Sequence, residues 1–114
     1  MSQAWRGFAK YLLAMHGLIG KIVATPGQRD ALTQILLDGV SGMPGCLSYV
    51  VAHDLADANA IWVTEVWEHA EAHRASLTLP AVQAAIAKGR PLIADFAPGT
   101  ITRPVGGHGL TAPR

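Results

Sequence analysis

The stretch IWVTEVW, residues 61–67, restricts the possible folds more than any other part of the sequence. Its β-branched and aromatic residues favour a β-strand. Because side chains alternate along a strand, one face carries Ile61, Val63, Glu65 and Trp67 and the other carries Trp62, Thr64 and Val66. Both faces are largely apolar, so we expect this strand to be covered on both sides.

Two strands and a helix are predicted before this segment. Residues 15–25 form a short apolar run that stops at Pro26-Gly27, which is typical of a strand followed by a turn. Pro26 suits the first turn of a helix, and an apolar stripe at helical spacing follows in Leu32, Ile35, Leu36 and Val40. We expect this helix to end within residues 39–45. Residues 46–53 are predicted to form the second strand, and residues 54–59 a tight connection.

The rest of the chain alternates helical composition with one weaker strand. Residues 68–77 have helical composition, and Pro80 can begin a second helical piece that Pro91 ends or kinks. Residues 96–105 are a strand candidate, restricted to an edge by its two prolines. Residues 1–14 are interpreted as an upstream extension or leader and residues 106–114 as a glycine-rich tail, which leaves one domain over residues 15–105.

This order of elements is β-α-β-β-α-β, the ferredoxin-like split βαβ plan of the α+β class, with helices on one face of an antiparallel sheet. The chain has 114 residues, of which 50% are hydrophobic and 15% charged. So small a domain cannot bury that much apolar surface by itself. We therefore expect a homo-oligomer in which two sheets stack face to face.

Charge and cysteine content exclude several classes of protein. A formal net charge of +1 gives no broad positive surface for nucleic acid. The single cysteine, Cys46, cannot form an internal disulfide, which favours a reducing compartment, here the cytoplasm. The longest apolar stretches, residues 47–52 and 60–66, are far shorter than the roughly 20 residues that cross a membrane. The sequence therefore predicts a cytoplasmic protein without nucleic-acid or membrane partners.

Three segments together resemble the antibiotic biosynthesis monooxygenase family: Pro26-Gly27, PGCLSYVVAHD at residues 44–54, and WVTEVWEHAEAHRASLTLPAV at residues 62–82. The resemblance covers roughly residues 15–105. It implies a homodimeric α/β barrel that oxygenates small phenolic or quinol-like aromatics with dioxygen and needs no metal, flavin or haem. Many members carry a histidine nine positions after the tryptophan that corresponds to Trp67. Here Ser76 stands at that position and His73 three residues earlier.

The resemblance and the residue types together suggest a site. Trp67 could stack on a flat substrate and His73 could accept a phenolic proton near neutral pH, so these two are the candidate catalytic residues. The candidate substrate-binding residues are Tyr49, Trp62, Glu65 and Ser76.

Each of these residues also has a purely structural interpretation. His73 could be a solvated histidine on a charged helix face, and Trp67 could simply cap the core. Tyr49 could instead lie at a subunit interface. Glu65, a carboxylate in an apolar strand, needs a partner such as Arg90, Arg103 or a backbone donor.

Other chemistries find little support. His69 and His73 have the spacing of a helical metal pair, but no HExxH pattern or third ligand accompanies them. Residues 106–109 are glycine-rich without the strand and helix of a phosphate loop, and GxSxG is absent. The alternative to an oxygenase is a non-catalytic or isomerase member of the same fold that binds a small hydrophobic ligand. Haem binding is less favoured, since no proximal ligand stands out.

Overall fold

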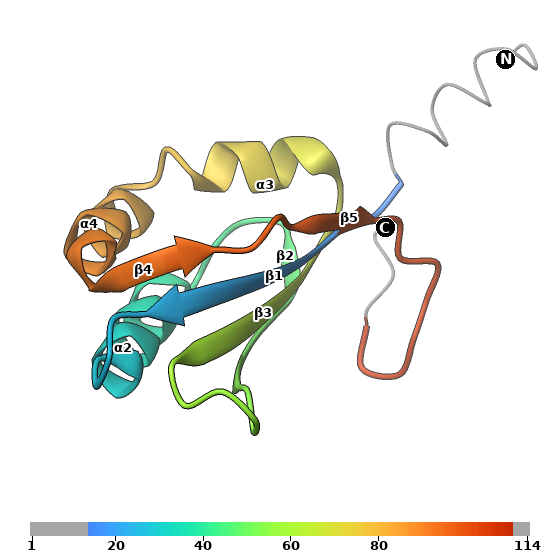
Figure 1. Cartoon of the computed structure of the whole chain (residues 1–114). Helices are drawn as coiled ribbons and strands as arrows, with labels where there is room; N and C mark the ends of the chain where they lie inside the picture. Colours follow the sequence, from blue (N-terminus) through green and yellow to red (C-terminus); the bar gives the residue numbers. More distant parts are fainter. Residues whose placement is uncertain (1–13, 111–114) are drawn as a thin grey trace, which may run out of the picture.

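The computed structural model describes residues 14–110, in which helices lie against one face of an antiparallel sheet (Figure 1). The elements are β1 (His16–Ala24), α2 (Arg29–Gly39), β2 (Cys46–His53), β3 (Ala60–Trp67), α3 (Ala70–Ser76), α4 (Pro80–Gly89), the 3-10 helix η1 (Arg90–Leu92), β4 (Ile93–Phe96) and β5 (Thr100–Thr102). The predicted ferredoxin-like α+β fold is confirmed. Apart from Ala14, the predicted N-terminal extension lies outside the described residues, as does the end of the predicted tail.

The sheet has the order β2-β3-β1-β4. β5 also pairs with β1, at residues 17–19, whereas β4 pairs with residues 22–24. β1 runs antiparallel to β3 from His16 opposite Trp67 to Val23 opposite Ala60. β2 pairs with the other edge of β3, where Cys46 also lies opposite Trp67. The register therefore gathers His16, Cys46 and Trp67 at one end of the sheet. No helix within residues 14–110 is long and apolar enough to cross a membrane.

Two predicted boundaries are wrong, and both errors involve proline. The first helix begins at Arg29 and not at Pro26, because Pro26 and Gly27 form a turn in which Gly27 has a φ of +79°, a value that ends helical geometry. The strand predicted over residues 96–105 is confined to β5, because β4 ends at Phe96 and lies almost wholly before the predicted range. Pro98 lies in the gap between them and has no N–H to give to the sheet. The prediction that Pro91 ends the second helical segment is confirmed, since α4 gives way there to η1.

The core lies between the sheet and the helices. Its buried centre contains Ala24, Leu32, Ile61 and Val63, which come from β1, α2 and β3. Ile61, Val63 and Trp67 share one face of β3 and are all buried, as strand alternation predicts. Glu65 lies on this same face, so its carboxylate is directed into the covered side of the sheet.

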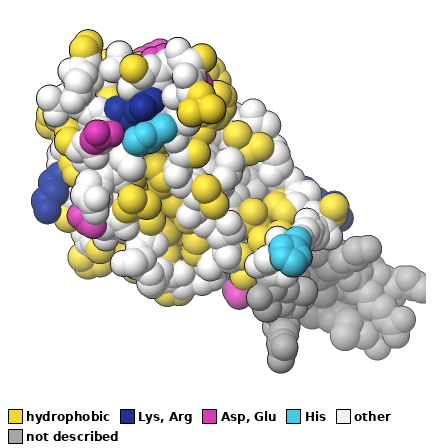
Figure 2. Space-filling view, turned by 90° about the horizontal axis from the view of Figure 1, so that it is seen from below, with side chains coloured by type: hydrophobic (Ala, Val, Ile, Leu, Met, Phe, Trp, Pro, Cys, Tyr) yellow, Lys and Arg dark blue, Asp and Glu magenta, His cyan; other side chains and the backbone are white. Residues whose placement is uncertain are grey.

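The opposite face of the sheet is not covered by any described part of the chain. On it Trp62 is 38% exposed, Val50 51% and Ile19 40%. These residues lie on three neighbouring strands, since Thr64 of β3 is opposite both Ile19 and Val50. Figure 2 shows hydrophobic side chains across the middle of the surface seen from below, with few charged side chains among them. The expected double cover of β3 is therefore absent in a single chain.

Candidate active site

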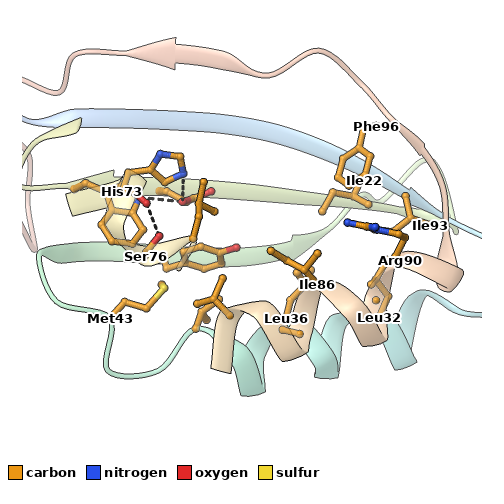
Figure 3. A pocket seen from close by; sticks show the side chains of 18 residues that line it. Ile22, Leu32, Leu36, Met43, His73, Ser76, Ile86, Arg90, Ile93 and Phe96 are labelled. Atoms are coloured by element: carbon orange, nitrogen blue, oxygen red, sulfur yellow. Dashed lines mark hydrogen bonds and ion pairs between the residues drawn. The ribbon is translucent and has the colours of Figure 1, made fainter. Parts of the chain in front are cut away.

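A cavity of about 270 Å³ lies between the covered face of the sheet and the helices (Figure 3). Most of its lining is apolar and comes from α2, α4 and the strands. The less apolar lining side chains are Tyr49, Glu65, Trp67, His73, Ser76 and Arg90. A cavity of about 150 Å³ holds benzene, so this one has room for roughly two fused aromatic rings.

The local sequence explains why one end of this cavity is polar. Alternation along β3 directs both Glu65 and Trp67 toward it, and α3 carries His73 and Ser76 three residues apart, on one helix face. The ring of His69 caps α3 by accepting a hydrogen bond from the Ala72 N–H at 3.2 Å. Gly45 lets the helix lie close to the sheet, because a Cβ there would come within 2.6 Å of the Ala72 Cβ.

Glu65 is held by Trp67. The indole Nε1–H donates to Glu65 Oε1 at 2.9 Å, and His73 Nε2 lies 4.0 Å from the same oxygen. The expected partners of this carboxylate, Arg90, Arg103 or a backbone donor, are therefore wrong. The actual donor stands two residues along the same strand, on the same face.

Burial shifts the pKa values of Glu65 and His73 in opposite directions. It raises the pKa of Glu65 above 4.5, and the indole hydrogen bond opposes the rise only in part. Burial, aided by the positive charge of Arg74, lowers the pKa of His73 below 6.5. The pKa values of the two groups therefore move toward each other.

Two aromatic rings fix the orientation of His73. The indole of Trp67 meets it edge to face with ring centres 5.4 Å apart, and the ring of His16 stacks on it at 5.7 Å. The side chain of His73 is thus only 25% exposed, which does not favour its interpretation as a solvated histidine. The sequence does not indicate this role of His16, because only the pairing of β1 with β3 brings it opposite Trp67.

The structure brings together five of the six predicted site residues. Tyr49 lies in the cavity opposite Glu65 on β2, on the face covered by the helices and away from the open face. Its pKa is raised by burial and by the charge of Glu65, so the phenol keeps its proton. Ser76 is buried, and its hydroxyl donates to the His73 carbonyl at 2.6 Å. This bond anchors the last turn of α3.

Trp62 is the exception, because strand alternation places it on the open face. Its indole donates to Asp54 Oδ2 at 2.7 Å, and Lys21 Nζ lies 5.5 Å from the ring centre. It is not among the residues that line the cavity. The prediction that Trp62 contacts a substrate in this cavity is therefore not supported within one chain.

Among residues 14–110, no group of three or more His, Cys, Asp or Glu side chains is arranged to hold a metal ion. Cys46 is a free thiol whose pKa is raised chiefly by burial.

Several known structures resemble this one. A protein from Chloroflexus aurantiacus J-10-fl, named "putative Antibiotic biosynthesis monooxygenase", is 64% identical, with a TM-score of 0.84 over 86% of this chain and 100% of its own. A protein of the same name from Caulobacter crescentus CB15 is 19% identical over 90% of this chain and 99% of its own, with a TM-score of 0.70. Rv0793 from Mycobacterium tuberculosis is 18% identical over 83% of this chain and 99% of its own, with a TM-score of 0.71. The last two show similarity of fold alone.

No curated protein matches the chain. The model of the antibiotic biosynthesis monooxygenase family matches residues 15–88, which is more than half of the sequence. The protein therefore belongs to the antibiotic biosynthesis monooxygenase family.

Proposed function

We propose that this protein is a cofactor-independent monooxygenase that acts on a small phenolic or quinol-like aromatic with dioxygen. The observation that carries the proposal is the pairing of Glu65 with His73 at the buried end of an apolar cavity. An apolar cavity of this size takes up flat aromatic rings. Because the pKa of His73 is lowered, its ring is neutral at neutral pH, which is the form that can accept a phenolic proton.

The first step is proton transfer from the substrate hydroxyl to His73. Glu65 lies close enough to stabilise the imidazolium that forms. The electron-rich phenolate can then give one electron to dioxygen, and the resulting radical pair combines to form a carbon–oxygen bond. The peroxide anion formed takes back the proton held by His73, and loss of water from the resulting hydroperoxide completes the reaction. For a hydroquinone, the overall reaction converts the substrate and dioxygen into a hydroxyquinone and water.

The other cavity residues have roles that follow from their protonation states. Tyr49 keeps its proton and can donate a hydrogen bond to a substrate oxyanion. Ser76 already gives its hydroxyl hydrogen to the His73 carbonyl, so toward a substrate it can offer only lone pairs. Trp67 provides an indole beside His73 and also holds Glu65. We propose these residues, with Glu65, as the substrate contacts.

Oxygen uptake tests this function. The protein, treated with a chelator, is to be assayed against hydroquinones and anthrones with an oxygen electrode. We expect uptake above the uncatalysed rate for at least one compound. Saturable ligand binding without uptake across the panel would favour the alternative, a binding or isomerase member of the fold.

The rate should depend on pH through His73. Because its pKa lies below 6.5, the neutral imidazole dominates at neutral pH and is lost only as the pH falls through that lowered value. Glu65, His16 and Arg74 face or flank this ring, and the positive charge of Arg74 contributes to the lowered pKa of His73. We expect kcat/KM to be level around neutral pH and to fall on the acid side, with a midpoint below 6.5. A midpoint above 6.5 would contradict the assignment of His73 as the base.

We also propose that the protein forms a homodimer through the open face of the sheet. The exposed Ile19, Val50 and Trp62 would then pack against the same face of a second copy, giving β3 its second cover.

Light scattering at micromolar concentration should give twice the chain mass of 12.0 kDa. Val50→Glu, which places a charge in the middle of this face, should shift the protein to a monomer. The matched control is Leu37→Glu, which changes an exposed leucine on α2 and should leave the dimer intact. A monomeric wild-type protein would contradict the proposal.

A further inference from the structure

Arg90 occupies the end of the cavity opposite His73. It follows α4 as the first residue of η1 and belongs to the cavity lining. In Figure 3 its guanidinium points into the cavity near Ile22 and Ile93, while His73 and Ser76 lie at the far side. The cavity thus carries a cation at one end and the Glu65–His73 pair at the other.

The guanidinium has no protein partner within residues 14–110. The ion pairs in this range are His73 with Glu65 and Arg74 with Glu71, and no hydrogen bond from the Arg90 side chain occurs there. An arginine presents several N–H donors in a planar fork that fits a carboxylate. A cation left free at the edge of an apolar cavity is therefore suited to an anionic group of a ligand.

The end of the cavity at Arg90 suits a charged group of a ligand better than the end at His73 does. Phe96 is 62% exposed and Ile86 39%, so this end opens to solvent. Trp67 and Ser76, at the opposite end, are only 1% and 4% exposed. A carboxylate beside Arg90 keeps part of its hydration, whereas one beside Glu65 would be buried against a like charge.

We propose that Arg90 selects aromatic substrates that carry a carboxylate on the side away from the reacting hydroxyl. The proposal rests on the proposed function for the role of the His73 end. The substrate class is then a hydroxyaryl acid of about two rings, with its hydroxyl at the Glu65–His73 pair and its carboxylate at Arg90.

The probes are 6-hydroxy-2-naphthoate and its neutral carboxamide, which have the same rings and hydroxyl and differ only in charge. Their dissociation constants are to be measured by titration calorimetry at low salt, with the wild type and with Arg90→Gln. Lys88→Gln is the control, because it removes one positive charge from α4 outside this cavity.

We expect the wild type to bind the naphthoate about five- to tenfold more tightly than the carboxamide. Arg90→Gln should abolish this preference with little change in carboxamide binding, and Lys88→Gln should retain it. Equal binding of the two compounds by the wild type, a preference that survives in Arg90→Gln, or no binding of either would overturn the proposal. Binding is measured separately from oxygen uptake, so an Arg90-dependent preference in a protein that shows no oxygen uptake would leave this inference standing while the oxygenase function fails.

Discussion

Replacing His73 with asparagine should lower kcat/KM for any substrate of this protein by about 10² to 10⁴-fold, the usual contribution of a positioned general base. Asparagine is polar and of similar reach but cannot take up a proton in this pH range. The expected loss is therefore mainly in kcat. It should be accompanied by loss of the acid limb of the pH profile, because the titrating group is gone.

The matched control is His53→Gln. His53 is exposed at the end of β2, and its Nε2 lies 2.9 Å from the Thr33 hydroxyl, outside the cavity. This variant should keep the wild-type rate. If His73→Asn stays folded, as shown by an unchanged far-ultraviolet circular dichroism spectrum, and turns over substrate as fast as the wild type, His73 is not the base.

Replacing Trp67 with alanine should lower the free energy of unfolding by about 3 to 5 kcal/mol, the range measured for buried tryptophan and phenylalanine in other proteins. Trp67 is 1% exposed, and its removal would leave a void at the end of the sheet. Loss of its indole N–H would also deprive the Glu65 carboxylate of its hydrogen bond. Thermal unfolding at fixed protein concentration should show Tm lowered by about 10 °C or more.

Two further variants separate the causes of this loss. Trp67→Phe keeps most of the buried ring but not the N–H donor, so it should destabilise less and raise the pKa of Glu65 further. Leu55→Ala changes a fully exposed leucine and should leave Tm within the error of measurement. A Tm for Trp67→Ala equal to that of Leu55→Ala would show that this tryptophan does not hold the core.

The fold was predictable from the sequence because its strongest signals are local. Strand alternation over residues 61–67 correctly separates Trp67 from Trp62, and the apolar stripe through Leu32 identifies the helix that covers the core. The boundary errors at Pro26 and Pro98 arose where proline is compatible with more than one local structure. The Pro26-Gly27 turn is itself a local signal, and the error was to let the helix begin inside it.

The site was less predictable because it is assembled from distant segments. The hydrogen bond from Trp67 to Glu65 could have been anticipated, since the two share a strand face. The stacking of His16 on His73 depends on β1 pairing with β3, and spacing along the chain does not indicate it. The place of Arg90 in the cavity likewise follows from how α4 and η1 pack on the sheet.

The most direct test of the account is a single-turnover reaction under isotopically labelled dioxygen, using the best substrate from the oxygen-uptake panel. The purified protein is treated with a chelator, and the product and any hydrogen peroxide are analysed by mass spectrometry and a peroxide assay. We predict one labelled oxygen atom in each product molecule, no accumulation of peroxide, and loss of labelling in His73→Asn. Unlabelled quinone with an equal amount of hydrogen peroxide, at the same rate with and without His73, would contradict monooxygenation at this site.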